Sequence, residues 1–74
     1  MTEDLNALAT FVALAEARSF RGAGDRLGVT ASAVSQTLRR LEERLGVALA
    51  HRTSRSMRLT DAGEQLYASA RPAI

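Results

Sequence analysis

The chain has 74 residues, enough for one small domain that buries roughly 60% of the surface of its unfolded state. It contains no cysteine and no apolar run approaching about 18 residues, so we expect no disulfide, no thiolate metal site and no membrane-spanning helix. The first residues, MTEDLNAL, lack the basic start and apolar core of a signal peptide, so we expect a cytoplasmic protein.

The net charge is only +2, but the basic residues are gathered in the second half of the chain. Residues 1–37 contain three Arg against four acidic residues, whereas residues 38–74 contain seven Arg against four. All ten basic residues are Arg, whose guanidinium matches phosphates and guanine edges in a way that the ammonium of Lys does not. A high-GC codon bias is the simpler explanation for the use of Arg, but not for its clustering.

The first part of the chain predicts two helices. Apolar residues repeat at helical spacing over residues 5–17, which indicates the first helix. Ser19 is a favourable N-cap for a second helix over 20–27, and Gly28 ends it because glycine tolerates a positive φ. The residues of this second helix that we expect to be buried are Phe20, Ala23 and Leu27.

The next segment predicts a third helix over 31–45, with Thr30 as N-cap and Gly46 as its end. Its buried stripe is formed by Val34, Leu38 and Leu41. In a helix-turn-helix the two helices cross closely, which requires a small residue on the first helix and apolar residues around the turn. The residues that meet these requirements are Gly24, Leu27, Val29 and Val34.

The remaining residues predict a hairpin and a last helix. Residues 47–52 and 57–59 are short apolar and basic segments typical of two strands, with TSRS at 53–56 as their turn. Thr60 is the N-cap of a helix that we expect to continue towards residue 74. The order of elements predicts a mainly α fold, a winged helix-turn-helix with a three-helix core and a two-stranded wing.

The third helix carries a polar face that suits DNA. Counting about 100° per residue from Val34, the side chains of Ser32, Ser35, Gln36 and Arg39 fall between about 100° and 200°. A recognition helix presents such residues from its N-terminal half to base edges in the major groove. The helix N-terminus and Thr30 can also donate hydrogen bonds to a phosphate. The alternative is a solvated face with an Arg39–Glu43 ion pair.

The hairpin is strongly basic. The sequence HRTSRSMR places Arg52, Arg55 and Arg58 beside small hydroxyl residues, on a loop that we expect cannot bury them. Arginines there can enter a narrow minor groove or contact phosphates, and Arg55 at the tip is the strongest candidate. The alternative is a merely soluble turn, which would more often include an acidic residue.

Two other motifs do not indicate catalysis or cofactor binding. The segment GAGDRLG at 22–28 resembles a dinucleotide-binding loop, but it follows a helix rather than a strand. His51 is the only histidine, and without a cysteine or second histidine it predicts neither a metal site nor a nucleophile–base pair. We therefore expect no enzyme, no metal and no cofactor.

The whole chain resembles the N-terminal DNA-binding domain of LysR-type transcriptional regulators. The matching stretches are LATFVALAEARSF at 8–20, AGDRLGVTASAVSQTLRRLEERLG at 23–46, L-A-H-R at 49–52 and R-L-T-D-A-G at 58–63. The resemblance implies residues 1–59 as the DNA-binding domain and 60–74 as the start of a linker and dimerisation helix. It also implies a homodimer, a pseudo-palindromic operator and an effector-binding domain that this chain lacks.

The resemblance and the residue patterns together give one set of expected site residues. We expect contact with double-stranded DNA at Ser19, Thr30, Ala31, Ser32, Ser35, Gln36, Arg39, Arg52, Thr53 and Arg55. We expect dimerisation through Leu66, Ala70 and Ile74, with Ala70 and Ile74 beyond the edge of the domain.

The sequence departs from the family pattern at three positions. Gly24 stands where the family usually has Ala, Ala50 where it has Phe, and Ala31 where it often has Gln. We expect a looser hairpin and one fewer base contact, with Gly24 still meeting the requirement for a small residue.

Two binding functions remain as alternatives. A MarR-type winged-helix repressor has a similar hairpin end, but only one helix precedes the helix-turn-helix here. A winged helix used only for protein contact would need an exposed apolar patch on the third helix.

Overall fold

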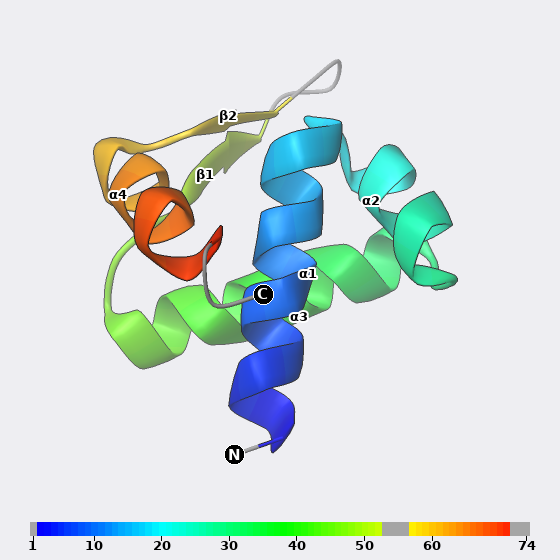
Figure 1. The fold of residues 1–74 in the computed structure, drawn as a ribbon, viewed down its shortest axis with the longest axis horizontal. Helices are drawn as coiled ribbons and strands as arrows, with labels where there is room; N and C mark the ends of the chain where they lie inside the picture. The colour runs from blue at the N-terminus through cyan, green and yellow to red at the C-terminus, as the bar shows by residue number, and fades with distance from the viewer. Residues whose placement is uncertain (1, 53–56, 72–74) are drawn as a thin grey trace.

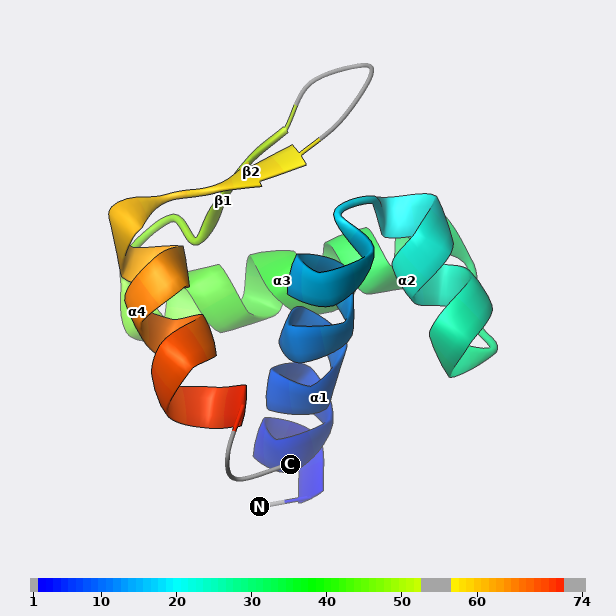
Figure 2. The same ribbon diagram turned by 45° about the horizontal axis from the view of Figure 1, so that its top comes forward.

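The computed structural model describes residues 2–52 and 57–71. Its elements, in chain order, are α1 (Thr2–Ala17), α2 (Phe20–Leu27), α3 (Ala31–Leu45), β1 (Ala50–Arg52), β2 (Met57–Leu59) and α4 (Asp61–Ala70). The helix α1 contacts α2, α3 and α4, and the views in Figures 1 and 2 place it between α2 and α4. This order of elements confirms the predicted winged helix-turn-helix.

Local caps define the ends of α2 and α3. The hydroxyl of Ser19 accepts the backbone N–H of Gly22 at 2.9 Å, and the hydroxyl of Thr30 accepts that of Ala33 at 3.0 Å. Gly28 and Gly46 both adopt a φ of 71°, the left-handed conformation that glycine reaches without strain. The predicted bounds of these two helices are therefore confirmed.

The helix α1 begins at Thr2, three residues before the predicted start. The apolar periodicity that predicted the helix starts only at Leu5. The preceding TED is typical of a first helical turn, where the helix dipole favours acidic residues. Periodicity alone therefore gives too short a helix.

The core lies where α1 and α3 meet the hairpin. Its most deeply buried large side chains are Phe11, Leu14, Val34, Leu38 and Leu49. The predicted stripe of α3 is buried, but Leu27 and Val29 are 38% and 47% exposed. The expectation that Leu27 is buried is therefore wrong. Leu27 is the last residue of α2 and Val29 lies in the turn after it. Both line a shallow groove whose other walls are α1 and α3, so their side chains stay open to solvent.

The crossing of α2 and α3 is as close as the helix-turn-helix pattern predicts. A Cβ atom added to Gly24 would lie 2.6 Å from the carbonyl oxygen of Val29, which is too near for a non-bonded carbon. The Val29 N–H in turn donates to the Gly24 carbonyl at 2.9 Å. The prediction that this position needs a very small residue is confirmed.

The hairpin is shorter than predicted because residues 47–49 use their backbone elsewhere. In the antiparallel pair β1–β2, Ala50 lies opposite Leu59 and Arg52 opposite Met57. Before β1, the Leu49 N–H donates to the carboxylate of Glu42 and the Leu49 carbonyl accepts the N–H of Thr60. These bonds hold residues 47–49 against α3 and α4, so the prediction of a strand from residue 47 is wrong.

The helix α4 packs back onto the domain. The Thr60 hydroxyl accepts the Gly63 N–H at 3.0 Å and donates to the Ala48 carbonyl at 2.7 Å. Leu66 and Tyr67 pack against the core, and Ala70 is only 6% exposed. The expectation that Ala70 lies beyond the edge of the domain is therefore wrong, because α4 lies along α1. Ile74 lies outside the described residues.

Candidate DNA-binding surface

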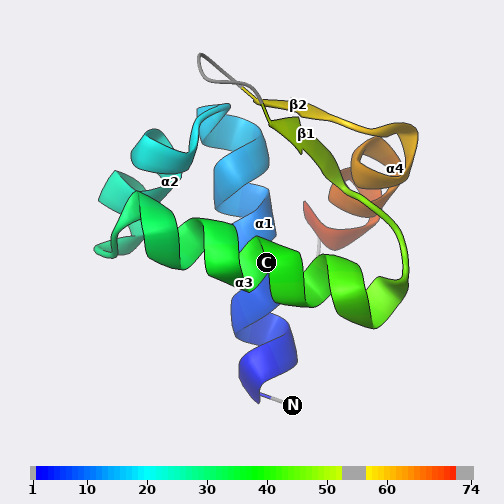
Figure 3. The ribbon, with the colours of Figure 1, turned by 180° about the vertical axis from the view of Figure 1, so that it is seen from behind.

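The outer face of α3 is not covered by another element. Figure 3 shows α3 crossing in front of α1, with α2 at one end and the hairpin above. Of the predicted contact residues on this face, Ser32, Gln36 and Arg39 are exposed and Ser35 is half-buried. The opposite face carries the buried Val34, Leu38 and Leu41, so the predicted separation of the two faces is confirmed.

The charged residues of this face are not paired with one another. In the part of the chain that the structure describes, Arg39 forms no ion pair with Glu43. Both side chains line a shallow depression that Gln36 and Arg40 complete. The ion pair that the alternative interpretation expects is therefore not formed, whereas the face is exposed as both interpretations expect.

The two cap residues remain able to donate hydrogen bonds. In Ser19 and Thr30 the hydroxyl oxygen accepts a backbone N–H, which leaves the O–H free as a donor. Thr30 is exposed and Ser19 and Ala31 are half-buried. The first turn of α3 also presents unpaired backbone N–H groups with a positive helix dipole, an arrangement that favours anions such as phosphate.

The hairpin turns its basic residues to two different sides. Side chains alternate along a strand, so Arg52 lies on the same side as the buried Ala50, whereas His51 and its partner Arg58 face outward. Consequently Arg58 is exposed, but the side chain of Arg52 is only 28% exposed. Arg52 as a whole residue remains exposed, so the expectation that the hairpin does not bury its arginines is not contradicted, although the Arg52 side chain is partly covered.

Arg52 contacts three side chains that lie on two helices, α3 and α2. Its Nη1 donates to the hydroxyl of Ser35 at 3.0 Å, and its Nη2 lies 3.5 Å from Oε1 of Glu42. Its guanidinium carbon lies 5.3 Å from the centre of the Phe20 ring. Neither Glu42 nor Phe20 was among the residues predicted to lie at the site. Glu42 lies about 80° from Val34 on the helical wheel, between the buried stripe and the outer face, which is the one signal that could have indicated it.

Thr53 and Arg55, the predicted contact residues of the hairpin turn, lie outside the described residues. Their expected role therefore stays a prediction.

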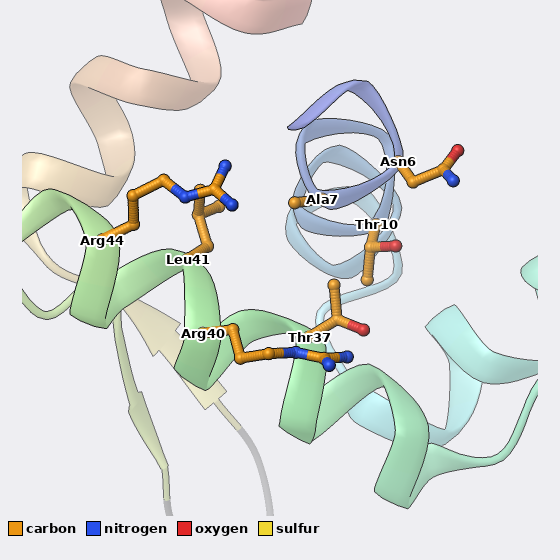
Figure 4. Close-up of a pocket in the computed structure, with 7 residues that line it drawn as sticks. All are labelled: Asn6, Ala7, Thr10, Thr37, Arg40, Leu41 and Arg44. Carbon is orange, nitrogen blue, oxygen red and sulfur yellow. The ribbon is translucent and has the colours of Figure 1, made fainter. Parts of the chain in front are cut away.

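A second basic region flanks the outer face of α3. A cleft of about 260 Å³ between α1 and α3 is lined by Asn6, Ala7, Thr10, Thr37, Arg40, Leu41 and Arg44. Figure 4 shows Thr10 and Thr37 facing each other, while the two arginines extend from α3. Among the described residues that line the cleft, Arg40 and Arg44 are basic and none is acidic.

Among the residues that the structure describes, no three His, Cys, Asp or Glu side chains are grouped so that they could hold a metal ion. Over the same ranges, no helix has the length and apolar composition needed to cross a membrane.

The chain is similar to full-length regulators over a small part of their length. It is 48% identical to YcaN, an uncharacterised HTH-type transcriptional regulator of Escherichia coli strain K12, over the whole chain and 24% of the relative. It is 52% identical to the HTH-type transcriptional regulator PtxR of Pseudomonas aeruginosa, over 86% of the chain and 20% of the relative. The chain thus spans a quarter or less of the length of these relatives.

Solved structures with a similar fold include complexes with DNA. The DNA-binding domain of CbnR in a DNA complex is 35% identical, with a TM-score of 0.89 over 93% of this chain and 79% of that chain. The DNA-binding domain of BenM bound to benA site 1 DNA is 36% identical, with a TM-score of 0.87 over 93% and 78% of the two chains.

The family model for bacterial regulatory helix-turn-helix proteins of the lysR family matches residues 5–64. The match covers both helices of the helix-turn-helix, the hairpin and the start of α4. It favours a LysR-type domain over a MarR-type repressor. The chain therefore belongs to the lysR family of bacterial regulatory helix-turn-helix proteins.

Proposed function

We propose that this domain binds double-stranded DNA sequence-specifically, with the N-terminal half of α3 in the major groove and the hairpin beside it. The observation that carries the proposal is the uncovered polar face of α3, beside a hairpin that carries basic residues. The CbnR and BenM domains, which have this fold, form complexes with DNA, which supports the proposal.

Each predicted DNA-contact residue on and beside α3 has a proposed role. Gln36 and Arg39 carry donors that can pair with base edges, and Arg39 suits the two acceptors of guanine. The small side chains of Ala31, Ser32 and Ser35 let the helix approach the bases closely. Thr30 and Ser19, with free O–H groups at the starts of α3 and α2, donate to phosphates. On the hairpin, Arg58 contacts the DNA backbone, and Thr53 and Arg55 belong to the same contact by prediction.

We further propose that the regulator acts as a homodimer on a pseudo-palindromic operator. A two-fold dimer binds two half-sites that are one helical turn or a multiple of it apart. The helix that begins with α4 is the proposed dimerisation element, with Leu66 and Ile74 among its contacts. Because Ala70 already packs within its own domain, exposed residues such as Ala68 offer the better contact on α4.

Other proposals follow from the relatives. The relatives are a little over four times as long as this chain, so we assign effector sensing to the part of such a regulator outside the matched region. A transcription regulator acts on the chromosome, and we therefore propose a cytoplasmic location.

A winged helix used only for protein contact is not favoured, because the outer face of α3 is polar and its exposed leucine, Leu45, lies at the far end.

Two neighbouring arginines on α3 test the proposed reading of bases. Arg39→Ala should lose roughly 1–3 kcal/mol of binding free energy on the preferred duplex and relax specificity at one base position. Arg40→Ala removes the same charge one residue further along, from the flank beside the cleft, and should weaken binding to all sequences equally. Fluorescence anisotropy on a preferred and a scrambled duplex measures both. Equal losses on both duplexes for both variants would mean that α3 is not the reader.

A further inference from the structure

We infer that Arg52 is a positioning residue, which locks the hairpin onto the recognition helix and orients Ser35, rather than a direct phosphate contact. The inference rests on the proposed function, because it concerns how this DNA-binding surface is held in shape. It is carried by the contacts of Arg52 with Ser35, Glu42 and Phe20.

The strand geometry directs Arg52 towards the helices. As the last residue of β1, Arg52 shares a side with Ala50, which belongs to the core. Its side chain therefore extends over α3 and is 28% exposed, whereas Arg58 lies on the other side of the hairpin and is exposed. The two arginines of the same hairpin thus have different surroundings and, we infer, different tasks.

Glu42 holds the beginning and the end of β1 at the same time. One carboxylate oxygen, Oε2, accepts the backbone N–H groups of Leu49 at 2.8 Å and Ala50 at 3.3 Å. The other, Oε1, lies 3.5 Å from Nη2 of Arg52. The Glu42 side chain is 17% exposed, and hydrogen bonds to an ionised carboxylate are stronger than those between neutral groups. One side chain of α3 therefore fixes where the whole strand lies.

The hydrogen bond from Arg52 orients the hydroxyl group of Ser35. A hydroxyl has one proton and two acceptor positions, and Nη1 of Arg52 occupies one acceptor position at 3.0 Å. The remaining proton then favours directions away from Arg52, towards the outer face of α3. Ser35 is thereby prepared to donate to an acceptor, such as a phosphate oxygen or the O6 or N7 of guanine, while only one acceptor position of its hydroxyl stays open.

Phe20 completes the site from a third element. It is the first residue of α2, directly after the N-cap Ser19, and its ring lies 5.3 Å below the guanidinium. The planar guanidinium can stack on this ring while its edges donate to Ser35 and Glu42. A Lys ammonium cannot make all three contacts, because it lacks the planar fork.

The two possible roles of Arg52 predict opposite effects of a change at Glu42. If Arg52 only contacts phosphate, Glu42→Gln removes a competing negative charge and should strengthen binding to every DNA. If Arg52 is a positioning residue, Glu42→Gln loosens the hairpin and should weaken binding to the preferred duplex. Glu43→Gln is the matched control, since it removes the same charge at the next residue of α3, which is exposed.

The experiment measures the affinities of Glu42→Gln and Glu43→Gln for a preferred and a scrambled duplex at one salt concentration. For Glu42→Gln we expect about a tenfold loss on the preferred duplex, comparable with losing one charge-assisted hydrogen bond, and no loss on the scrambled duplex. Glu43→Gln should strengthen binding to both. If Glu42→Gln also strengthens binding to both duplexes, Arg52 is a phosphate contact and the inference is wrong.

A second variant keeps the test valid if Glu42→Gln folds poorly. Arg52→Lys retains the charge and leaves the bonds from Glu42 to Leu49 and Ala50 in place. We expect it to bind the scrambled duplex like the wild type and to lose affinity for the preferred one. In the double variant with Glu42→Gln the losses should not add, because both changes break the same contact. Additive losses would contradict the inference, whereas a wild type that does not distinguish the duplexes would overturn the proposed function itself.

Discussion

Raising the salt concentration from about 50 to 200 mM should weaken DNA binding by a factor of several hundred. The affinity for DNA falls with salt because each phosphate that a protein neutralises releases a counterion, at a slope of about 0.9 per phosphate on logarithmic axes. With about five phosphates neutralised per domain, the slope is about −4.5 and a fourfold increase in salt lowers the affinity roughly 500-fold. Titrations by fluorescence anisotropy at several salt concentrations measure this slope.

Arg58 provides the internal control for the salt experiment. It lies on the outward side of the hairpin, opposite His51, and is exposed. Arg58→Ala should make the slope shallower by about 0.9, as expected for one lost phosphate contact. A wild-type affinity that does not change over this range of salt would show that the arginines do not meet phosphates.

Replacing Gly63 by alanine should destabilise the domain strongly. A Cβ atom at this position would overlap the carbonyl oxygen of Leu49, which is backbone and cannot turn aside. That carbonyl already accepts the N–H of Thr60, so relief requires α4 to move away from the segment before β1. Overpacking of this kind lowers the free energy of unfolding by about 1–3 kcal/mol. Because the clash here is with backbone, we expect a value at the upper end of this range.

Thermal unfolding followed by circular dichroism measures the effect of Gly63→Ala. For a domain of this size, each kcal/mol lowers the Tm by roughly 4–8 °C. Ser69→Ala on the exposed side of α4 is the control and should leave the Tm unchanged or slightly raised, because alanine is the better helix former. A Gly63→Ala variant as stable as the wild type would contradict the packing of α4 against Leu49.

The parts of the fold that could be predicted are those that local chemistry determines. Ser19 and Thr30 as caps, with Gly28 and Gly46 as left-handed ends, fix the bounds of α2 and α3 without reference to other elements. The early start of α1 was missed because its first turn is polar and carries no apolar periodicity.

The parts that could not be predicted depend on residues distant in the sequence. The strand β1 starts late because Leu49 bonds to Glu42 and Thr60 instead of to β2. Ala70 is buried because α4 lies along α1, and the spacing of apolar residues within α4 does not indicate this. In each case a tertiary contact decided an outcome that the local pattern left open.

The same division holds for the candidate site. The outer face of α3 could be predicted because helical spacing alone separates Gln36 and Arg39 from the buried Val34. The surroundings of Arg52 could not be predicted, because its partners Glu42 and Ser35 lie 10 and 17 positions away in the sequence. Only the alternation of side chains from Ala50 would have suggested that Arg52 faces inward.

The measurement that tests the central claim most directly is a binding selection from a pool of random-sequence duplexes. Sequence-specific reading by α3 predicts that the bound DNA becomes enriched in one short motif. Action as a dimer predicts two inverted copies of that motif, one helical turn or a multiple of it apart. The same selection with Arg39→Ala should lose preference at one position of each copy. A bound pool with the same sequence composition as the starting pool would contradict the account.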